Sequence, residues 1–229
     1  MVLEKVKMGN IEKEEKIRQL LVSLCKISCI MNLLEEKILS EGVIRPGNIL
    51  KIDSFLNHQF QMDVMRFIAQ EFKRRFDGVK VTKVLTIEAS GIAIATMLGH
   101  YLDVPVVFAK KSETLNSSDD KYVSQAYSFT HKKRNKVFVC VPYLSTSDHI
   151  LIVDDFLAEG EATHALIDIV RQAGATVAGI GIAVEKGHQN GGRMLREEGY
   201  HLESLAIVEE MDYESQTIRF RDQSYQEKY

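Results

Sequence analysis

Residues 150–162 constrain the fold more than any other part of this 229-residue chain. They read Ile-Leu-Ile-Val-Asp-Asp-Phe-Leu-Ala-Glu-Gly-Glu-Ala, an apolar run followed by two adjacent acids and a glycine-containing turn. An unbroken run of branched aliphatics is typical of a strand that is buried on both faces of a parallel sheet. Open α/β sheets bind their ligands outside the carboxyl ends of such strands. We therefore expect Asp154 and Asp155 to lie at the ligand-binding edge of a sheet.

The turn after the acid pair has the properties of an anion site. A helical pattern begins at about residue 161, and the N–H groups of a first helical turn attract anions. The residues that would present these groups are Ala158, Glu159, Gly160, Glu161 and Ala162. Acid pair and turn together predict a ligand with hydroxyl groups and a phosphate. Taken alone, the same run also fits a plain strand cap and turn, so its context must decide.

Strand and helix patterns alternate along the chain, which predicts an α/β fold with a mainly parallel, doubly wound sheet. Strands are expected at 49–52, 84–87, 106–109, 150–153, 177–184 and 202–207, and helices at 62–76, 92–102, 161–173 and 191–198. Residues 123–130 and 137–141 are predicted to form an antiparallel hairpin. An amphipathic pattern over residues 11–39 predicts one further helix near the N-terminus.

Composition excludes several classes of function. The net charge of −3 provides no basic field for nucleic acid. The longest apolar runs are far shorter than the ~20 residues of a membrane-spanning helix, so no membrane contact is expected. Cysteine usage indicates the compartment: three cysteines without a CxxC pair favour a reducing, cytoplasmic location. The acids interspersed in residues 1–30 argue against a targeting peptide. The sequence predicts no metal site built from protein side chains.

Two further polar loops follow predicted parallel strands and should meet the acid pair at one sheet edge. The first loop consists of Glu88, Ala89, Ser90 and Gly91, where the glycine allows close backbone approach and a helix begins at once. It suits a diphosphate. The second begins with Lys110 and Lys111, two cations that can neutralise developing negative charge.

With these loops, the chain resembles the type I phosphoribosyltransferases, and among them the purine branch that acts on xanthine. The matching segments occur in the same order, at residues 53–59, 86–92, 127–130, 154–158 and 184–186. The resemblance spans about residues 31–220 and leaves out residues 1–30. It implies a phosphoribosyltransferase domain over residues 31–229, a small purine-binding hood, a helical extension over 1–30, and a homodimer.

The resemblance also implies a reaction and a role for each loop. Xanthine and 5-phosphoribosyl 1-diphosphate would give xanthosine 5′-monophosphate and diphosphate. Asp154 and Asp155 would bind the ribose hydroxyls and favour positive charge on the sugar, and the turn at residues 158–162 would bind the 5′-phosphate. The loop at residues 88–91 and the two lysines would bind the diphosphate together with Mg²⁺.

On the purine side, the resemblance places Leu50 and Asn57 against the base and Lys186 near a purine carbonyl. A lysine donor and an amide suit the carbonyls of an oxopurine. Phe156 is expected to stack on the ring. Each of these residues also has an ordinary interpretation: a core aromatic for Phe156, a solvated lysine for Lys186, and a turn or helix cap for Asn57.

Some features depart from the family pattern or leave alternatives open. Glu159 and Glu161 put two acids beside a proposed phosphate, and Lys110 stands where relatives tend to carry arginine. The histidines near these loops, His58, His149 and His164, show no metal-ligand spacing and are interpreted as structural or surface residues. The alternatives are a phosphoribosyltransferase for another oxopurine, guanine or hypoxanthine, and a non-catalytic regulator that senses phosphoribosyl diphosphate.

Overall fold

The protein is built on a six-stranded sheet with the order β10-β9-β8-β7-β3-β4. The computed structural model describes residues 31–111, 120–128 and 133–223. The strands are β3 (Lys83–Ile87), β4 (Val106–Ala109), β7 (His149–Leu157), β8 (Thr176–Lys186), β9 (Leu202–Asp212) and β10 (Thr217–Phe220). All neighbours run parallel except β10, which is antiparallel to β9. The predicted, mainly parallel α/β sheet is therefore confirmed.

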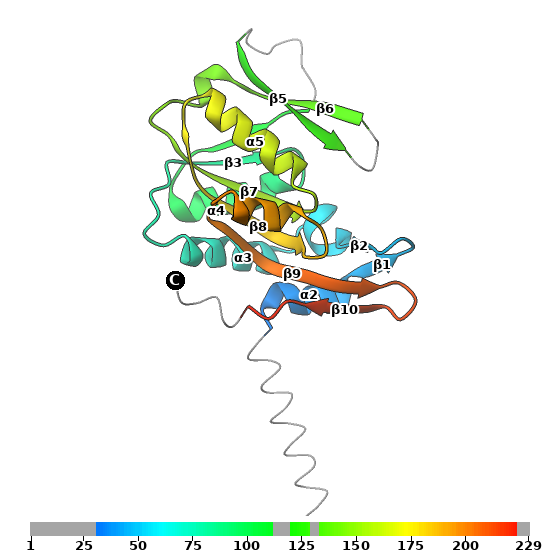
Figure 1. Ribbon diagram of the computed structural model, residues 1–229. Helices are drawn as coiled ribbons and strands as arrows, with labels where there is room; N and C mark the ends of the chain where they lie inside the picture. The colour runs from blue at the N-terminus through cyan, green and yellow to red at the C-terminus, as the bar shows by residue number, and fades with distance from the viewer. Residues whose placement is uncertain (1–30, 112–119, 129–132, 224–229) are drawn as a thin grey trace, which may run out of the picture.

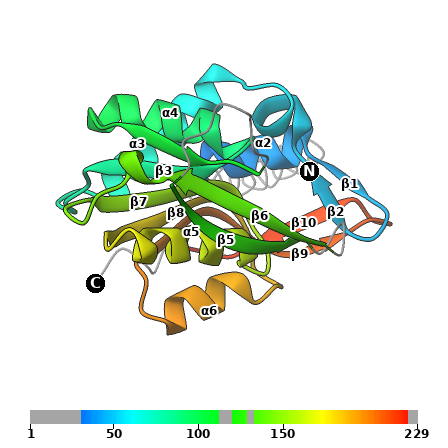
Figure 2. The same cartoon turned by 90° about the horizontal axis from the view of Figure 1, so that it is seen from above.

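Helices cover both faces of this sheet, as Figures 1 and 2 show. One face carries α2 (Leu33–Glu41), α3 (Met62–Arg75) and α4 (Gly91–Leu102), and the other carries α5 (Glu161–Gln172) and α6 (Gly191–Glu197). The sheet is thus doubly wound, as predicted. Among the described residues, no helix has the length and apolar character needed to cross a membrane.

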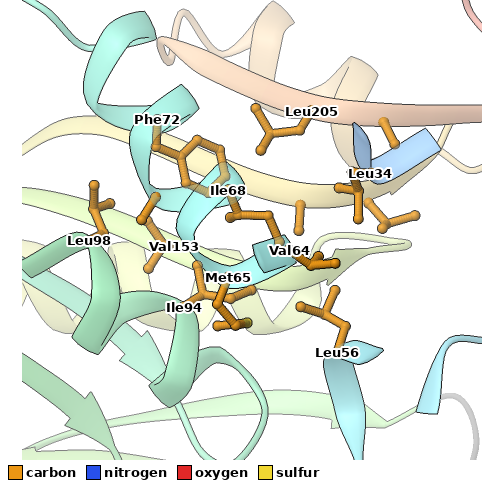
Figure 3. Packing of buried hydrophobic residues seen from close by; sticks show 14 of the residues in the cluster. Leu34, Leu56, Val64, Met65, Ile68, Phe72, Ile94, Leu98, Val153 and Leu205 are labelled. Atoms are coloured by element: carbon orange, nitrogen blue, oxygen red, sulfur yellow. The ribbon is translucent and has the colours of Figure 1, made fainter. Parts of the chain in front are cut away.

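The burial of β7 on both faces of the sheet explains why its sequence is continuously apolar. Leu151 and Val153 belong to the core cluster beneath α3 and α4, whereas Ile150 and Ile152 belong to the cluster beneath α5. Successive side chains of a strand point to opposite faces, so a strand covered on both sides needs apolar residues at every position. Figure 3 shows Val153 among side chains of α3 and α4, which include Phe72.

Two small hairpins lie outside the main sheet. β1 (Val43–Arg45) pairs antiparallel with β2 (Ile49–Lys51), and a π-helical turn (Asp53–Asn57) follows; we call these elements the hood. The other hairpin joins β5 (Lys121–Ser128) and β6 (Lys133–Cys140), and confirms the antiparallel pair that the sequence predicts. Figure 1 shows both hairpins on the side toward which the parallel strands point.

The predicted helix over residues 11–39 is wrong at residues 31 and 32, which are not helical, and residues 1–30 lie outside the described part of the chain. Asn32 has an extended backbone, with φ −87° and ψ 164°, and caps α2. Its side chain accepts hydrogen bonds from the N–H groups of Leu34 and Glu35, while the Glu35 carboxylate accepts from the Asn32 N–H. This capping box starts a helix at Leu33, because it satisfies donors that a continuous helix would have used.

The structure also corrects several strand boundaries. β7 continues to Leu157, since Asp154 and Phe156 pair with Ile182 and Val184 of β8, so the acid pair lies within the strand rather than beyond it. β8 likewise continues to Lys186. The segment after β2 forms a π-helical turn, and strands β1 and β10 have no counterpart in the sequence prediction.

Candidate active site

A buried carboxyl group stands at the centre of the candidate site. Asp154 is 6% exposed, and its Oδ1 accepts a hydrogen bond of 3.0 Å from the Asp155 N–H. Burial raises the pKa of Asp154 well above its ordinary value, and the adjacent Asp155 charge raises it further. The Lys111 charge acts in the opposite direction. The site therefore pairs a buried carboxyl that resists ionisation with a half-buried neighbour, Asp155.

The loop before α4 lies directly against Asp154. A Cβ atom added to Gly91 would stand 2.8 Å from Asp154 Oδ1 and 2.1 Å from Thr86 Oγ1. Only glycine leaves room for this approach, because real Cβ atoms keep a greater distance. The Thr86 hydroxyl is fully buried and has no hydrogen-bond partner within the described residues. Gly91 thus joins the loop at residues 88–91 to the acid pair.

The lysine loop lies beside the same edge. The Glu88 N–H donates to the Ala109 carbonyl at 3.1 Å, and the Lys111 N–H donates to Glu88 Oε1 at 2.5 Å. Lys110 exchanges two backbone hydrogen bonds with Phe138, of 2.9 and 3.0 Å, which tie this loop to the β5–β6 hairpin. The structure therefore brings together the two predicted loops and the acid pair.

The turn at residues 158–162 opens α5 as the sequence predicts. Gly160 occupies the N-cap position with φ +85°, a conformation that residues with a Cβ rarely adopt. Its carbonyl accepts from the His164 N–H at 2.9 Å and lies 2.9 Å from His164 Nδ1. Glu159 and Glu161 are half-buried, and neither carboxylate has a hydrogen-bond or ion-pair partner among the described residues. Glu161 in the first turn of α5 is favourable for the helix.

His164 supports the turn, a role that the sequence prediction did not assign to it. A carbonyl can only accept, so Nδ1 carries the proton toward Gly160. Nε2 lies 3.1 Å from Glu198 at the end of α6. The spacing of four residues between Gly160 and His164 on a helix start is the only sequence signal for this contact.

The residues proposed for the purine come from two parts of the fold. Lys186 Nζ lies 5.7 Å from the centre of the Phe156 ring, and burial lowers the pKa of Lys186. Leu50 is 6% exposed and belongs to the apolar cluster on which Phe156 packs. In the π-helical turn, Asn57 Oδ1 is buried without a hydrogen-bond partner in the described chain. An orphaned amide oxygen of this kind is unfavourable unless a ligand or water satisfies it.

Within the described residues, no three or more His, Cys, Asp or Glu side chains lie close enough together to hold a metal ion.

Comparison with solved structures supports the fold. Adenine phosphoribosyltransferase from Thermoanaerobacter pseudethanolicus superposes with a TM-score of 0.64 at 20% identity, covering 76% of this chain and 98% of that one. The enzyme from Giardia lamblia, complexed with 9-deazaadenine, gives a TM-score of 0.65 at 20% identity, covering 77% and 98%. Residues 51–193 also match the phosphoribosyl transferase domain. The chain therefore belongs to the phosphoribosyl transferase family.

Sequence relatives define the branch of this family. Xanthine phosphoribosyltransferase from Lachnoclostridium phytofermentans is 51% identical over 191 residues, covering 83% of this chain and 98% of that protein. The xanthine phosphoribosyltransferase of Bifidobacterium adolescentis is 52% identical over 192 residues, covering 83% and 100%. Xanthine phosphoribosyltransferase 1 from Clostridium perfringens is 53% identical, covering 80% and 96%.

The raised pKa of Asp154 predicts an unusual pH dependence of stability. The folded state holds this proton more tightly than the unfolded state, so the stability from this group is lost as pH rises from an ordinary aspartate pKa through the raised one. Asparagine mimics the protonated form at every pH. We expect Asp154→Asn to melt at a higher temperature than wild type at neutral pH. The melting temperatures of the two proteins should become equal below about pH 4.

Melting temperatures across this pH range test the prediction. Asp77→Asn, at an exposed position, serves as the control and should follow wild type throughout. A lower melting temperature for Asp154→Asn at neutral pH would contradict the sign, and a difference that is constant with pH would show that the carboxyl does not titrate as described.

Proposed function

We propose that this protein transfers the phosphoribosyl group of 5-phosphoribosyl 1-diphosphate to xanthine, which yields xanthosine 5′-monophosphate and diphosphate. The main support for this reaction is that the acid pair, the Gly91 loop and the turn at residues 158–162 lie at one edge of the sheet. The carboxylates of the acid pair can accept hydrogen bonds from hydroxyl groups. The loop and the turn on either side can donate backbone N–H groups to phosphates. The names of the relatives support xanthine as the base.

The acid pair is proposed to hold the ribose. Asp155 is the more accessible carboxylate and accepts hydrogen bonds from the sugar hydroxyls, with Asp154 behind it. The negative charge of Asp155 favours the positive charge that develops at C1 as the bond to diphosphate stretches. The 5′-phosphate lies against the backbone N–H groups of the turn at residues 158–162, at the start of α5. In this arrangement Glu159 and Glu161 contribute backbone donors only.

The leaving group is proposed to lie between the loop at residues 88–91 and the two lysines. When the C1–O bond breaks, its electron pair moves to the diphosphate, and Lys110 and Lys111 stand where that charge accumulates. A magnesium ion fits this donor set, because Mg²⁺ usually binds one or two carboxylates together with phosphate oxygens of the substrate. When bound, it would neutralise charge on the diphosphate.

The base is proposed to bind between the hood and the end of β8. A ring nitrogen of the base forms the new bond to C1, and its proton passes to solvent. Lys186 donates to a purine carbonyl, and the unsatisfied amide oxygen of Asn57 accepts from a ring N–H. Both contacts suit an oxopurine better than adenine. Guanine and hypoxanthine share one carbonyl with xanthine and are the nearest competitors.

Three broader properties belong to the same proposal. The phosphoribosyltransferase unit spans residues 31–229, with residues 1–30 as a separate extension. By resemblance to the family, the active assembly is a homodimer. The protein acts in the cytoplasm, in agreement with its cysteine usage.

A product assay tests the function directly. Purified protein is given 5-phosphoribosyl 1-diphosphate and Mg²⁺ with xanthine, guanine, hypoxanthine or adenine in parallel reactions, and diphosphate and nucleotide are quantified. We expect xanthine to give the highest kcat/KM and adenine to give no turnover above the level without base. Preference for guanine or hypoxanthine would reassign the base. Binding of the phosphoribosyl donor without any turnover would support the regulator instead.

The role of Lys186 predicts a selective loss of affinity. Removal of its amino group in Lys186→Ala leaves a purine carbonyl without its donor, so we expect the KM for xanthine to rise about 10- to 100-fold. The KM for 5-phosphoribosyl 1-diphosphate should change much less. Steady-state kinetics with each substrate varied in turn measures both values, with Lys80→Ala, at an exposed position, as the control. A larger change for the phosphoribosyl donor than for xanthine would move Lys186 to the other substrate.

A further inference from the structure

Glu185, one residue before Lys186 on β8, carries a buried charge that the reaction described above does not use. The side chain is 2% exposed, and it accepts a two-pronged hydrogen bond from Arg196 of α6, at 2.9 and 2.7 Å. Ser204 of β9 donates to the same carboxylate at 2.5 Å. Burial acts to raise the pKa of Glu185, but the bonds from Arg196 and Ser204 outweigh it and hold the pKa below its ordinary value. The pair is therefore ionised.

The start of α6 is wedged between this ion pair and the turn at residues 158–162. A Cβ atom at Gly192 would lie 2.0 Å from Glu185 Oε1, and one at Gly191 would lie 2.4 Å from the Ala158 carbonyl oxygen and 2.7 Å from the Gly160 nitrogen. The Gly191 N–H also donates to the Ala158 carbonyl at 3.0 Å. No side chain fits at either position. The two glycines therefore allow the backbone of α6 to pack directly against the Glu185 carboxylate and against the turn.

The other end of α6 contacts the same turn. Glu198 lies 3.1 Å from His164 Nε2, and His164 Nδ1 lies 2.9 Å from the Gly160 carbonyl oxygen. The turn is thus linked to α6 at both ends of the helix. Helix α6 itself is joined to the sheet by the two-pronged Arg196–Glu185 contact.

We propose that Glu185 and Arg196 are positioning residues that fix α6 and, through α6, align the backbone N–H groups of the turn for a phosphate. The inference rests on the proposed function, which gives the turn its 5′-phosphate. Neither side chain is assigned a contact with substrate. A planar guanidinium held in two places fixes both distance and orientation, which a single point charge does not. Backbone N–H donors bind a phosphate well only if they are already correctly oriented. A shift of a fraction of an ångström in α6, which supports them, would therefore weaken phosphate binding.

Variants at Arg196 separate positioning from plain stability. Arg196→Gln leaves the buried Glu185 charge without its partner and is expected to destabilise the fold. The double variant Glu185→Gln with Arg196→Gln removes both charges and should recover most of the melting temperature, because a neutral pair avoids the unpaired buried charge. Arg196→Lys keeps the charge but loses the fork. Arg193→Gln is the matched control, because Arg193 is an exposed arginine on the same helix whose side chain bonds only Asn190 among the described residues.

The readouts are the KM for each substrate, kcat, the melting temperature, and the calorimetric Kd for ribose 5-phosphate. This ligand probes the turn and the acid pair without the diphosphate loops or the base site. We expect the double variant to keep a KM for 5-phosphoribosyl 1-diphosphate raised by about tenfold, with a matching rise in the Kd for ribose 5-phosphate. The KM for xanthine and kcat should change by less than about threefold. Arg196→Lys should fall between wild type and the double variant, and Arg193→Gln should match wild type.

The outcomes distinguish this inference from the proposed function. A stable double variant with wild-type values for both the phosphoribosyl donor and ribose 5-phosphate would overturn the positioning role, as would equal changes in the KM of both substrates. Wild-type protein that releases no diphosphate but binds ribose 5-phosphate would contradict the reaction, and the Kd values of the variants would still test the positioning role. Wild-type protein that does not bind ribose 5-phosphate would overturn both.

Discussion

The burial of one carboxyl group in the middle of the sheet is the constraint to which the surrounding elements adapt. Asp154 stands on β7, between β3 and β8, where a full negative charge is unfavourable. The neighbouring backbone compensates in part, through the Asp155 N–H. Gly91 has no side chain because Asp154 and Thr86 already occupy that space. In the proposed reaction, this unfavourable arrangement is relieved when a sugar with hydroxyl donors and a developing positive charge binds at the edge.

The layers of the fold provide rigidity where the proposed chemistry needs it. Strands covered on both faces place the ends of β3, β4 and β7 in fixed relation, and the loops between strand and helix are short. Contacts with α6 hold the turn at residues 158–162, so the positions of its N–H groups are fixed. Adenine phosphoribosyltransferases share this fold at 20% identity. The fold alone therefore does not set the base in the proposed reaction, which depends on side chains around its site, such as Asn57 of the hood and Lys186 at the end of β8.

Much of this arrangement could be predicted from the sequence, because the signals were local. The continuous aliphatic run of β7 indicates burial on both faces, and a parallel sheet necessarily gathers the loops that follow its strands. The continuation of β7 through Asp154 could not be predicted, since two acids resemble a strand end and the pairing with β8 that extends it is not local. The break at Asn32 was hidden by apolar periodicity on both sides of a capping box. The Glu185–Arg196 contact joins a strand to a helix, and neither residue differs in sequence from an ordinary surface charge.

The most direct measurement of the central claim is the affinity of the acid pair for the phosphoribosyl donor. Calorimetric titration of 5-phosphoribosyl 1-diphosphate with Mg²⁺ into wild type and into the double variant Asp154→Asn with Asp155→Asn provides it, with melting temperatures to confirm that the variant is folded. We predict binding at one site per chain in wild type and an affinity lower by at least about tenfold in the folded variant. Equal affinity in the two proteins would contradict a role for Asp154 and Asp155 in holding the sugar.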